Sequence, residues 1–170
     1  PINYSEMPTF LIKSLLLQED RNFFDQGDWL PNRSNWHGFS MAILYRYFSG
    51  GGGSNITQQL VKNMAFNSVF PQDIQRKLAE TLTAYQLSIQ SSPEIIITSY
   101  LNDVGFSGGR SHRGIVNGSI QTFGRQIQAS NNLEILYLVS TLKWGSKFGT
   151  SSGYIDYNEV AFHADEIKEA

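Results

Sequence analysis

Three short segments of this sequence place acidic and basic side chains at spacings that could do chemistry together. In the first, Glu19-Asp20, Glu19 lies one helical turn after Leu15, and Phe23 comes next along the same predicted face. A carboxylate beside apolar surface is poorly solvated, which makes it a better proton acceptor near neutral pH. Taken alone, the pair is more simply explained as a solvated acidic surface.

The second segment runs from Ser54 to Gln59 and follows four glycines. It is expected to open a helix with Ser54 as N-cap, and the first-turn N–H groups of such a helix suit an anion. Lys62 lies four residues beyond Gln58, so both can face one ligand. No Gly-Lys-Ser/Thr follows the glycines, which excludes a Walker loop. An ordinary capped amphipathic helix is the structural alternative.

The third segment, Arg76-Lys77-Leu78-Ala79-Glu80, sets two cations three and four residues before a carboxylate. A surface salt bridge, worth a few tenths of a kcal/mol, would explain the spacing without any function. The histidines have no paired metal-ligand spacing, so no His-built metal site is predicted. They are His37, His112 and His163.

Composition narrows the classes of function further. The 170 residues are 41% hydrophobic and 16% charged, with a net charge of −2 and no cysteine. The absence of cysteine excludes a disulfide scaffold, a Cys-zinc site and a thiol nucleophile. With no basic run, nucleic acid is not an expected partner. No apolar run is long enough to span a bilayer, and the opening at Pro1 suggests an excised domain.

Helical periodicity extends nearly throughout and strand alternation is absent, so the sequence predicts one all-α domain over residues 1–170. The helices are expected at about 8–24, 39–49, 54–66, 71–90, 91–102, 113–123, 132–144 and 157–169, with Gly124 and Gly145 ending two of them. The buried stripe expected within 71–90 consists of Ile74, Leu78, Leu82, Tyr85 and Ile89.

In their order and spacing, the charged segments resemble the motifs of the bacterial peptidoglycan glycosyltransferase domain, glycosyltransferase family 51. This domain occurs in bifunctional penicillin-binding proteins and in monofunctional transglycosylases. Residues 19–24 resemble its Glu-Asp-x-x-Phe motif, and residues 53–63 its Gly-Ser-Thr-Ile-Thr-Gln-Gln motif with the following Lys-Asn. Arg76-Lys77-x-x-Glu80 matches the third motif, residues 96–102 match the fourth, and residues 114–134 follow the fifth region.

The resemblance covers about residues 5–148 and implies a lysozyme-like, two-lobed helical domain that polymerises lipid II. Glu19 would be the general base, and Glu80 a second catalytic carboxylate near the donor pyrophosphate, where a divalent cation (Mg or Mn) could also bind. The implied substrate-binding residues are Asp20, Phe23, Ser54, Thr57, Gln58, Gln59, Lys62, Arg76, Lys77, Tyr100 and Asn102.

The same resemblance implies the partners and the location. They are lipid II, the growing glycan strand, a transpeptidase and the membrane surface, at the extracytoplasmic face of a bacterial inner membrane. Residues 26–50, which carry Trp29 and Trp36, match the part of the family that dips into the membrane surface. No membrane anchor lies within this sequence.

Two other classes of function stay open, one because of departures from the motifs and the other because a catalytic Glu in a helical lysozyme-like lobe also serves glycan cleavage. Residues 64–75 contain no basic residue, Ala79 stands where a Lys often precedes the motif's Glu, and residues 91–93 lack the usual Lys. Because these cations would face a pyrophosphate, one alternative is a catalytically weak relative that binds lipid II or glycan. The other is a lytic transglycosylase or muramidase acting on finished peptidoglycan.

Overall fold

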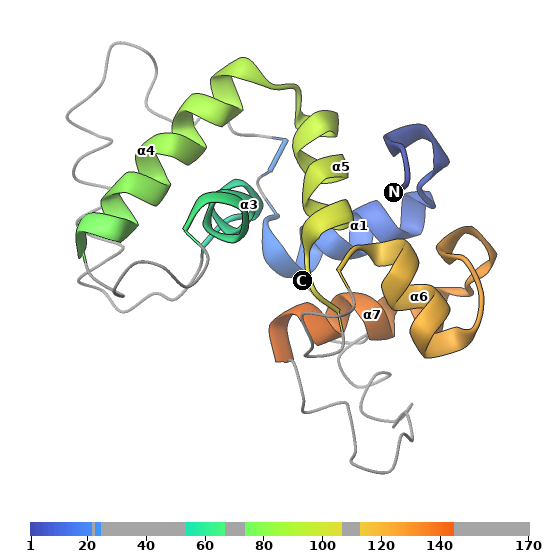
Figure 1. Ribbon diagram of the computed structural model, residues 1–170. Coiled ribbons are helices and arrows are strands. Elements are labelled where there is room, and N and C mark those ends of the chain that lie inside the picture. The colour runs from blue at the N-terminus through green and yellow to red at the C-terminus, as the bar shows by residue number, and fades with distance from the viewer. Residues whose placement is uncertain (22, 25–53, 67–73, 107–112, 145–170) are drawn as a thin grey trace. The chain divides into compact units, whose positions relative to one another are not determined.

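The computed structural model describes residues 1–21, 23–24, 54–66, 74–106 and 113–144 (Figure 1). Its elements are η1 (Tyr4–Glu6), α1 (Thr9–Glu19), α3 (Ile56–Ala65), α4 (Ile74–Gln90), α5 (Pro93–Asp103), α6 (Ile115–Phe123), η2 (Ile127–Ala129) and α7 (Asn132–Trp144). Within these residues there is no β-strand, only an isolated antiparallel bridge between Gly105 and Arg113. The prediction of an all-α fold is confirmed.

The chain divides into two compact units, in agreement with the predicted two lobes. The first unit comprises residues 1–21 and 97–170, and the second comprises residues 22–96, so the boundary falls inside α5. Assignment of residues 1–170 to one domain stays a prediction. The expected helices at 39–49 and 157–169, and the expected membrane-facing residues 26–50, lie outside the described residues.

In the first unit, α1 packs against α7, and α6 packs against α7 and η2 (Figure 1). Leu11 and Leu15 of α1 and Leu138 and Val139 of α7 are fully buried. Gly124 ends α6 in the left-handed conformation (φ 70°), as expected for a helix-terminating glycine. The core of this unit therefore forms around the helix whose last residue is Glu19.

In the second unit, α3 packs against α4 (Figure 1). The buried stripe predicted for α4 is wrong at two positions, because Leu78 and Ile89 are 46% and 47% exposed, whereas Leu82 and Tyr85 are half-buried. Among the α4 residues whose side chains the structure describes, the buried ones are Glu80 and Ala84.

Glu80 can be buried because its carboxylate pairs with Arg76 of the same helix. The adjacent residue Thr81 accepts a hydrogen bond from Gln58 of α3, so this side of α4 faces α3. Hydrophobic periodicity alone therefore did not identify the residues of α4 that are most buried.

Two helix boundaries also differ from the sequence expectation. α1 ends at Glu19, not near residue 24, because Asp20 takes an extended, non-helical φ of −161°. α3 is capped by Asn55, not Ser54: the Asn55 side chain accepts a hydrogen bond from the Gln58 N–H at 2.7 Å. None of the helices in the described part of the chain is long and apolar enough to cross a membrane.

Candidate active-site residues

Glu19 is the C-terminal residue of α1 and is half-buried. Its neighbour Gln18 donates from Nε2 to Glu19 Oε1 at 3.2 Å and to the Val139 carbonyl of α7 at 2.7 Å. Because α1 ends here, the prediction that Phe23 continues the same helical face is wrong; Phe23 is buried beside the Phe24 ring. The Gln18 amide is thus a hydrogen-bond donor to the Glu19 carboxylate.

Tyr100 of α5 belongs to the same unit and is completely buried. Burial raises the pKa of its phenol, and the negative charge of Glu19 raises it further. The phenol therefore stays protonated at physiological pH, close enough to Glu19 for the carboxylate's charge to be felt. Both residues were predicted to belong to the site, and this electrostatic interaction relates them within one unit.

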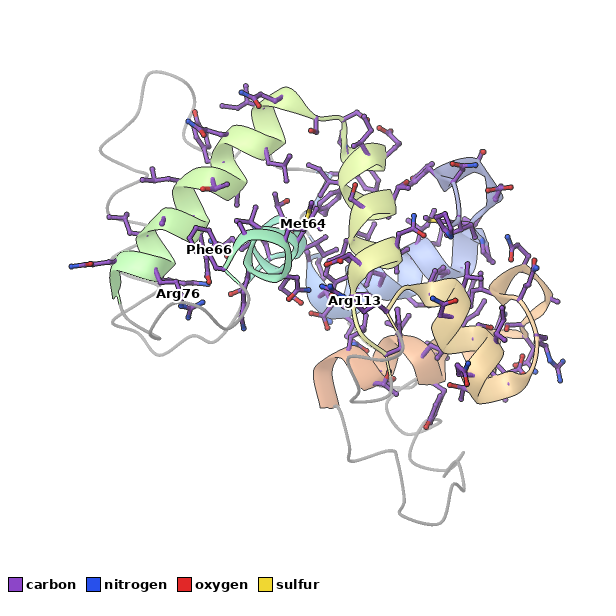
Figure 2. All side chains as sticks on the ribbon, in the orientation of Figure 1. Met64, Phe66, Arg76 and Arg113 are labelled. Carbon is purple, nitrogen blue, oxygen red and sulfur yellow. The ribbon has the colours of Figure 1, made fainter. Side chains whose placement is uncertain are left out.

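Glu80 lies in the second unit and is only 1% exposed. Arg76, labelled in Figure 2 near the start of α4, forms a salt bridge with Glu80 Oε1, and Lys77 Nζ lies 3.4 Å from Glu80 Oε2. Exposed surface pairs of this kind contribute little, whereas loss of one partner of a buried pair typically costs about 3–5 kcal/mol. The burial therefore rules out the surface-pair interpretation of Arg76-Lys77-x-x-Glu80.

Lys77 connects Glu80 to Ser54, and the interacting residues Ser54, Arg76, Lys77 and Glu80 are called the Glu80 cluster below. Its Nζ donates to the Ser54 hydroxyl at 2.6 Å. Burial lowers the pKa of Lys77 below 10.5; the attraction and hydrogen bond of Glu80 oppose this, and the positive charges of Arg76 and Lys62 lower it further. Two cations thus pair with one carboxylate, and the charge of Lys62 acts on Lys77, so positive charges outnumber the negative one in this group.

The first turn of α3 is tied together by its own polar side chains. Gln58 Oε1 accepts from the Asn55 N–H at 3.2 Å, which completes a capping box, and Gln58 Nε2 donates to the Thr81 hydroxyl at 3.2 Å. Gln59 Nε2 donates to the Ser54 carbonyl at 3.0 Å. In the described part of the chain, Gln58 and Gln59 therefore stabilise the start of α3. Their contact with substrate stays a prediction.

Asn102, also predicted to bind substrate, ties down the N-terminal segment instead. Its Oδ1 accepts from the Ile2 N–H at 2.8 Å and its Nδ2 donates to the Ile2 carbonyl at 2.9 Å. Gly114 approaches the Asn102 carbonyl so closely, at a φ of +85°, that an added Cβ would lie 2.8 Å from that oxygen. The geometry favours the scaffolding part of the role expected for Asn102.

The structure thus forms one group of predicted residues in each unit. Glu19 and Tyr100 interact in the first unit; Ser54, Arg76, Lys77 and Glu80 interact in the second, with Lys62 exposed but electrostatically coupled to Lys77. Asp20 is the C-cap of α1. Thr57 is buried, and its hydroxyl has no hydrogen-bond partner among the described residues.

Three polar residues that hold these groups were not predicted. The capping role of Asn55 could have been found, because Asn followed three residues later by Gln is a capping-box spacing. Thr81 and Gln18 give no comparable signal, since their partners lie 23 and 121 residues away.

A resident divalent cation does not fit the described residues. No group of three or more His, Cys, Asp or Glu side chains gathers among them. Both oxygens of Glu80 already face cations, Arg76 and Lys77, whose charges would oppose a metal ion at that carboxylate.

Comparison with known proteins identifies the family. The family model described as Transglycosylase matches residues 1–163, beyond the limits of about 5–148 inferred from the motifs. The chain is 32% identical over 152 residues to penicillin-binding protein 1B of Buchnera aphidicola subsp. Baizongia pistaciae, which covers 86% of the chain and 20% of the relative. It is 30% identical over 147 residues to penicillin-binding protein 1B of Escherichia coli, covering 84% and 17%.

A third relative is penicillin-binding protein 1A of Mycobacterium tuberculosis, 32% identical over 131 residues, covering 75% of the chain and 15% of the relative. The chain therefore spans a fifth or less of the length of these relatives. The matches support the predicted glycosyltransferase activity and do not favour the two alternatives weighed from the sequence. With matched residues that include all four charged or polar motifs, the chain belongs to the Transglycosylase family.

Proposed function

We propose that this chain is a peptidoglycan glycosyltransferase that polymerises lipid II into glycan strands. In the proposed reaction, the 4-hydroxyl oxygen of the acceptor sugar attacks the anomeric carbon of the lipid-linked donor. Glu19 takes the hydroxyl proton, the bond from the anomeric carbon to the pyrophosphate oxygen breaks, and the lipid pyrophosphate leaves with the electron pair. Attack opposite the leaving group inverts the anomeric configuration.

The observation that carries this proposal is the surplus of positive charge around Glu80. Arg76 and Lys77 pair with that carboxylate, and Lys62 adds a third positive charge that Lys77 feels. A pyrophosphate would relieve the repulsion between these cations and stabilise them, most strongly as its charge grows during departure. Glu80 would then hold Arg76 and Lys77 in position. No step of this mechanism passes through a metal ion.

Glu19 suits the role of base for a different reason. The Gln18 amide donates to Glu19 Oε1 at the half-buried end of α1, and the charge of Glu19 acts on the Tyr100 phenol of the same unit. Glu80 is instead almost completely buried and paired with Arg76 and Lys77, which suits it to hold those cations and not to take up a proton.

The partners and the location are proposed on the strength of the family. We infer that the chain acts with a membrane surface that carries lipid II, at the extracytoplasmic face of a bacterial inner membrane. The relatives named penicillin-binding proteins support a transpeptidase as a partner activity.

One assay tests the function directly: incubation of the protein with labelled lipid II and, separately, with finished peptidoglycan. The proposal predicts polymer from lipid II and no fragments from peptidoglycan. Fragments released from peptidoglycan would instead indicate a lytic enzyme. Binding of lipid II without turnover would indicate a binding relative.

A further inference from the structure

We propose that Gln18 is a positioning residue that holds the Glu19 carboxylate in place by bridging it to the backbone of α7. This inference rests on the proposed function, in which Glu19 is the base. It concerns a residue that none of the sequence motifs includes.

The bridge is defined by two hydrogen bonds from one nitrogen. Gln18 Nε2 donates to the Val139 carbonyl at 2.7 Å and to Glu19 Oε1 at 3.2 Å. An amide nitrogen has two N–H groups, so both donors are used and both bonds can form at once. One partner is the reacting carboxylate, and the other is backbone in the middle of the helix on which α1 packs.

The backbone partner also fixes which way round the amide lies. Amide oxygen and nitrogen are hard to distinguish by shape, so their assignment follows from the hydrogen-bond partners. The Val139 carbonyl can only accept, and a flipped amide would set two oxygens against each other at 2.7 Å. Nε2 must therefore face Val139, which also directs a donor, not an acceptor, toward Glu19.

This orientation of the Gln18 amide leaves its oxygen buried without a hydrogen bond from the described residues, which destabilises the folded chain. Gln18 Oε1 is buried and has no hydrogen-bond partner among the described residues. A buried acceptor without a partner destabilises the folded chain. A side chain needed only for packing at position 18 could be apolar and would bury no oxygen. An amide that donates to both Val139 and Glu19 necessarily brings its own oxygen with it.

A donor aimed at a carboxylate favours its ionised form, which is the form that accepts a proton. Val139 lies in the packed core of the first unit, so the bridge also limits the rotamers open to Glu19. The other titratable groups described on α1 and just after it are Lys13, Asp20 and Arg21; those on the parts of α5 and α7 in the same unit are Tyr100, Asp103, Glu134 and Tyr137. The effect of Gln18 on the position of the Glu19 carboxylate does not require a change in the charge of any of these groups.

The test uses two variants and a matched control in the full chain. Gln18→Met keeps length and burial but removes the donor, and Gln18→Glu keeps the shape but places a second carboxylate beside Glu19. Gln121→Met makes the same change at an exposed position on α6. Polymerisation of lipid II is followed against substrate concentration, with thermal unfolding measured in parallel.

Gln18→Met is expected to lower kcat by about 3- to 20-fold, with KM for lipid II changed by less than about twofold. In Gln18→Glu, repulsion between two neighbouring carboxylates should displace the Glu19 side chain and lower kcat at least as far. Gln121→Met should match the parent. An unchanged kcat in Gln18→Met, or an activity that falls only with the folded fraction, would overturn the inference.

Failure of the proposed function gives a different result. Glu19→Gln in the same assay should make almost no polymer; a parental rate in that variant would refute the base and overturn this inference with it. The bridge itself is checked without activity by the ¹³C resonance of the Glu19 carboxyl carbon at fixed pH. Displacement of that resonance in Gln18→Met but not in Gln121→Met supports the bridge, and no displacement overturns it.

Discussion

The two carboxylates that the motifs single out occupy contrasting environments. Glu19, in the first unit, is half-buried at a helix end and is held by a neutral amide. Glu80, in the second unit, is almost completely buried and faces two cations. Environments that differ in this way let one carboxyl group change its protonation state while another keeps its charge. The contrast supports the proposal that Glu19 takes up the proton and Glu80 holds the cations in position.

The contrast extends to stability. Removal of the charge of Glu80 breaks its ion pairs with Arg76, itself only 10% exposed, and with Lys77, whereas removal of the charge of Glu19 leaves an oxygen that can still accept from Gln18. Activity and stability should therefore separate at Glu19 and fall together at Glu80. Each prediction below challenges or refines one side of that contrast.

The largest expected effect is on the rate at Glu19. Glu19→Gln should lower lipid II polymerisation by about 10²- to 10⁴-fold, because Gln keeps the size of Glu but cannot accept the hydroxyl proton. Glu94→Gln, at a fully exposed position, is the control and should polymerise at the parental rate. Retained activity in Glu19→Gln would erase the functional difference between the two carboxylates.

A smaller effect is expected on ligand binding at the edge of the Glu80 cluster. Lys62→Ala should weaken binding of a pyrophosphate-bearing lipid by about 1.5–3 kcal/mol, the loss expected for a charge-assisted hydrogen bond. Lys13→Ala, which removes an exposed Lys from α1, is the matched control. Titration calorimetry or fluorescence binding measures both, and equal affinities for Lys62→Ala and the parent would remove Lys62 from the site.

The smallest effect is expected on stability at Lys77. Because burial is the main cause that lowers its pKa below 10.5, charged Lys77 is unfavourable to the fold at neutral pH. Lys77→Met should therefore change the free energy of unfolding by less than about 1 kcal/mol, or raise it slightly.

The pH dependence gives the sign of the Lys77 effect. Between the folded-state pKa of Lys77 and 10.5, the unfolded chain binds more protons than the folded chain, so this residue's contribution to stability rises with pH. The parent should gain stability relative to Lys77→Met as pH rises through that window. A parent that loses stability relative to the variant there would show that the Glu80 attraction outweighs burial.

Much of the local structure could be predicted because its causes are local. The ends of α4 and α6 lie where Gln90 and Phe123 were expected, since a Ser-Ser-Pro sequence and Gly124 act within one helical turn. The family could be predicted because four short motifs kept their order, and residues within one motif, such as Arg76 and Glu80, meet through helical geometry.

Burial could not be predicted from the same local signals. The apolar residues of α4 suggested that Leu78 faces the core, yet the helix buries Glu80, because the charge of that residue is neutralised by Arg76. The role of Gln18 could not be predicted from neighbouring residues, because its hydrogen-bond partner Val139 lies 121 residues later in the chain. Such positions are set by tertiary packing, which overrides the preference of the sequence for one helical face.

The most direct test of the contrast between the two carboxylates is the free energy of unfolding of Glu80→Gln and Glu19→Gln, measured side by side with the parent by chemical denaturation. Glu80→Gln should lose about 3–5 kcal/mol, because it breaks the largely buried ion pair with Arg76. Glu19→Gln should stay within about 0.5 kcal/mol of the parent, because the Gln side chain can still accept from Gln18. Equal losses in the two variants, or a larger loss in Glu19→Gln, would contradict the assignment of different roles to the two carboxylates.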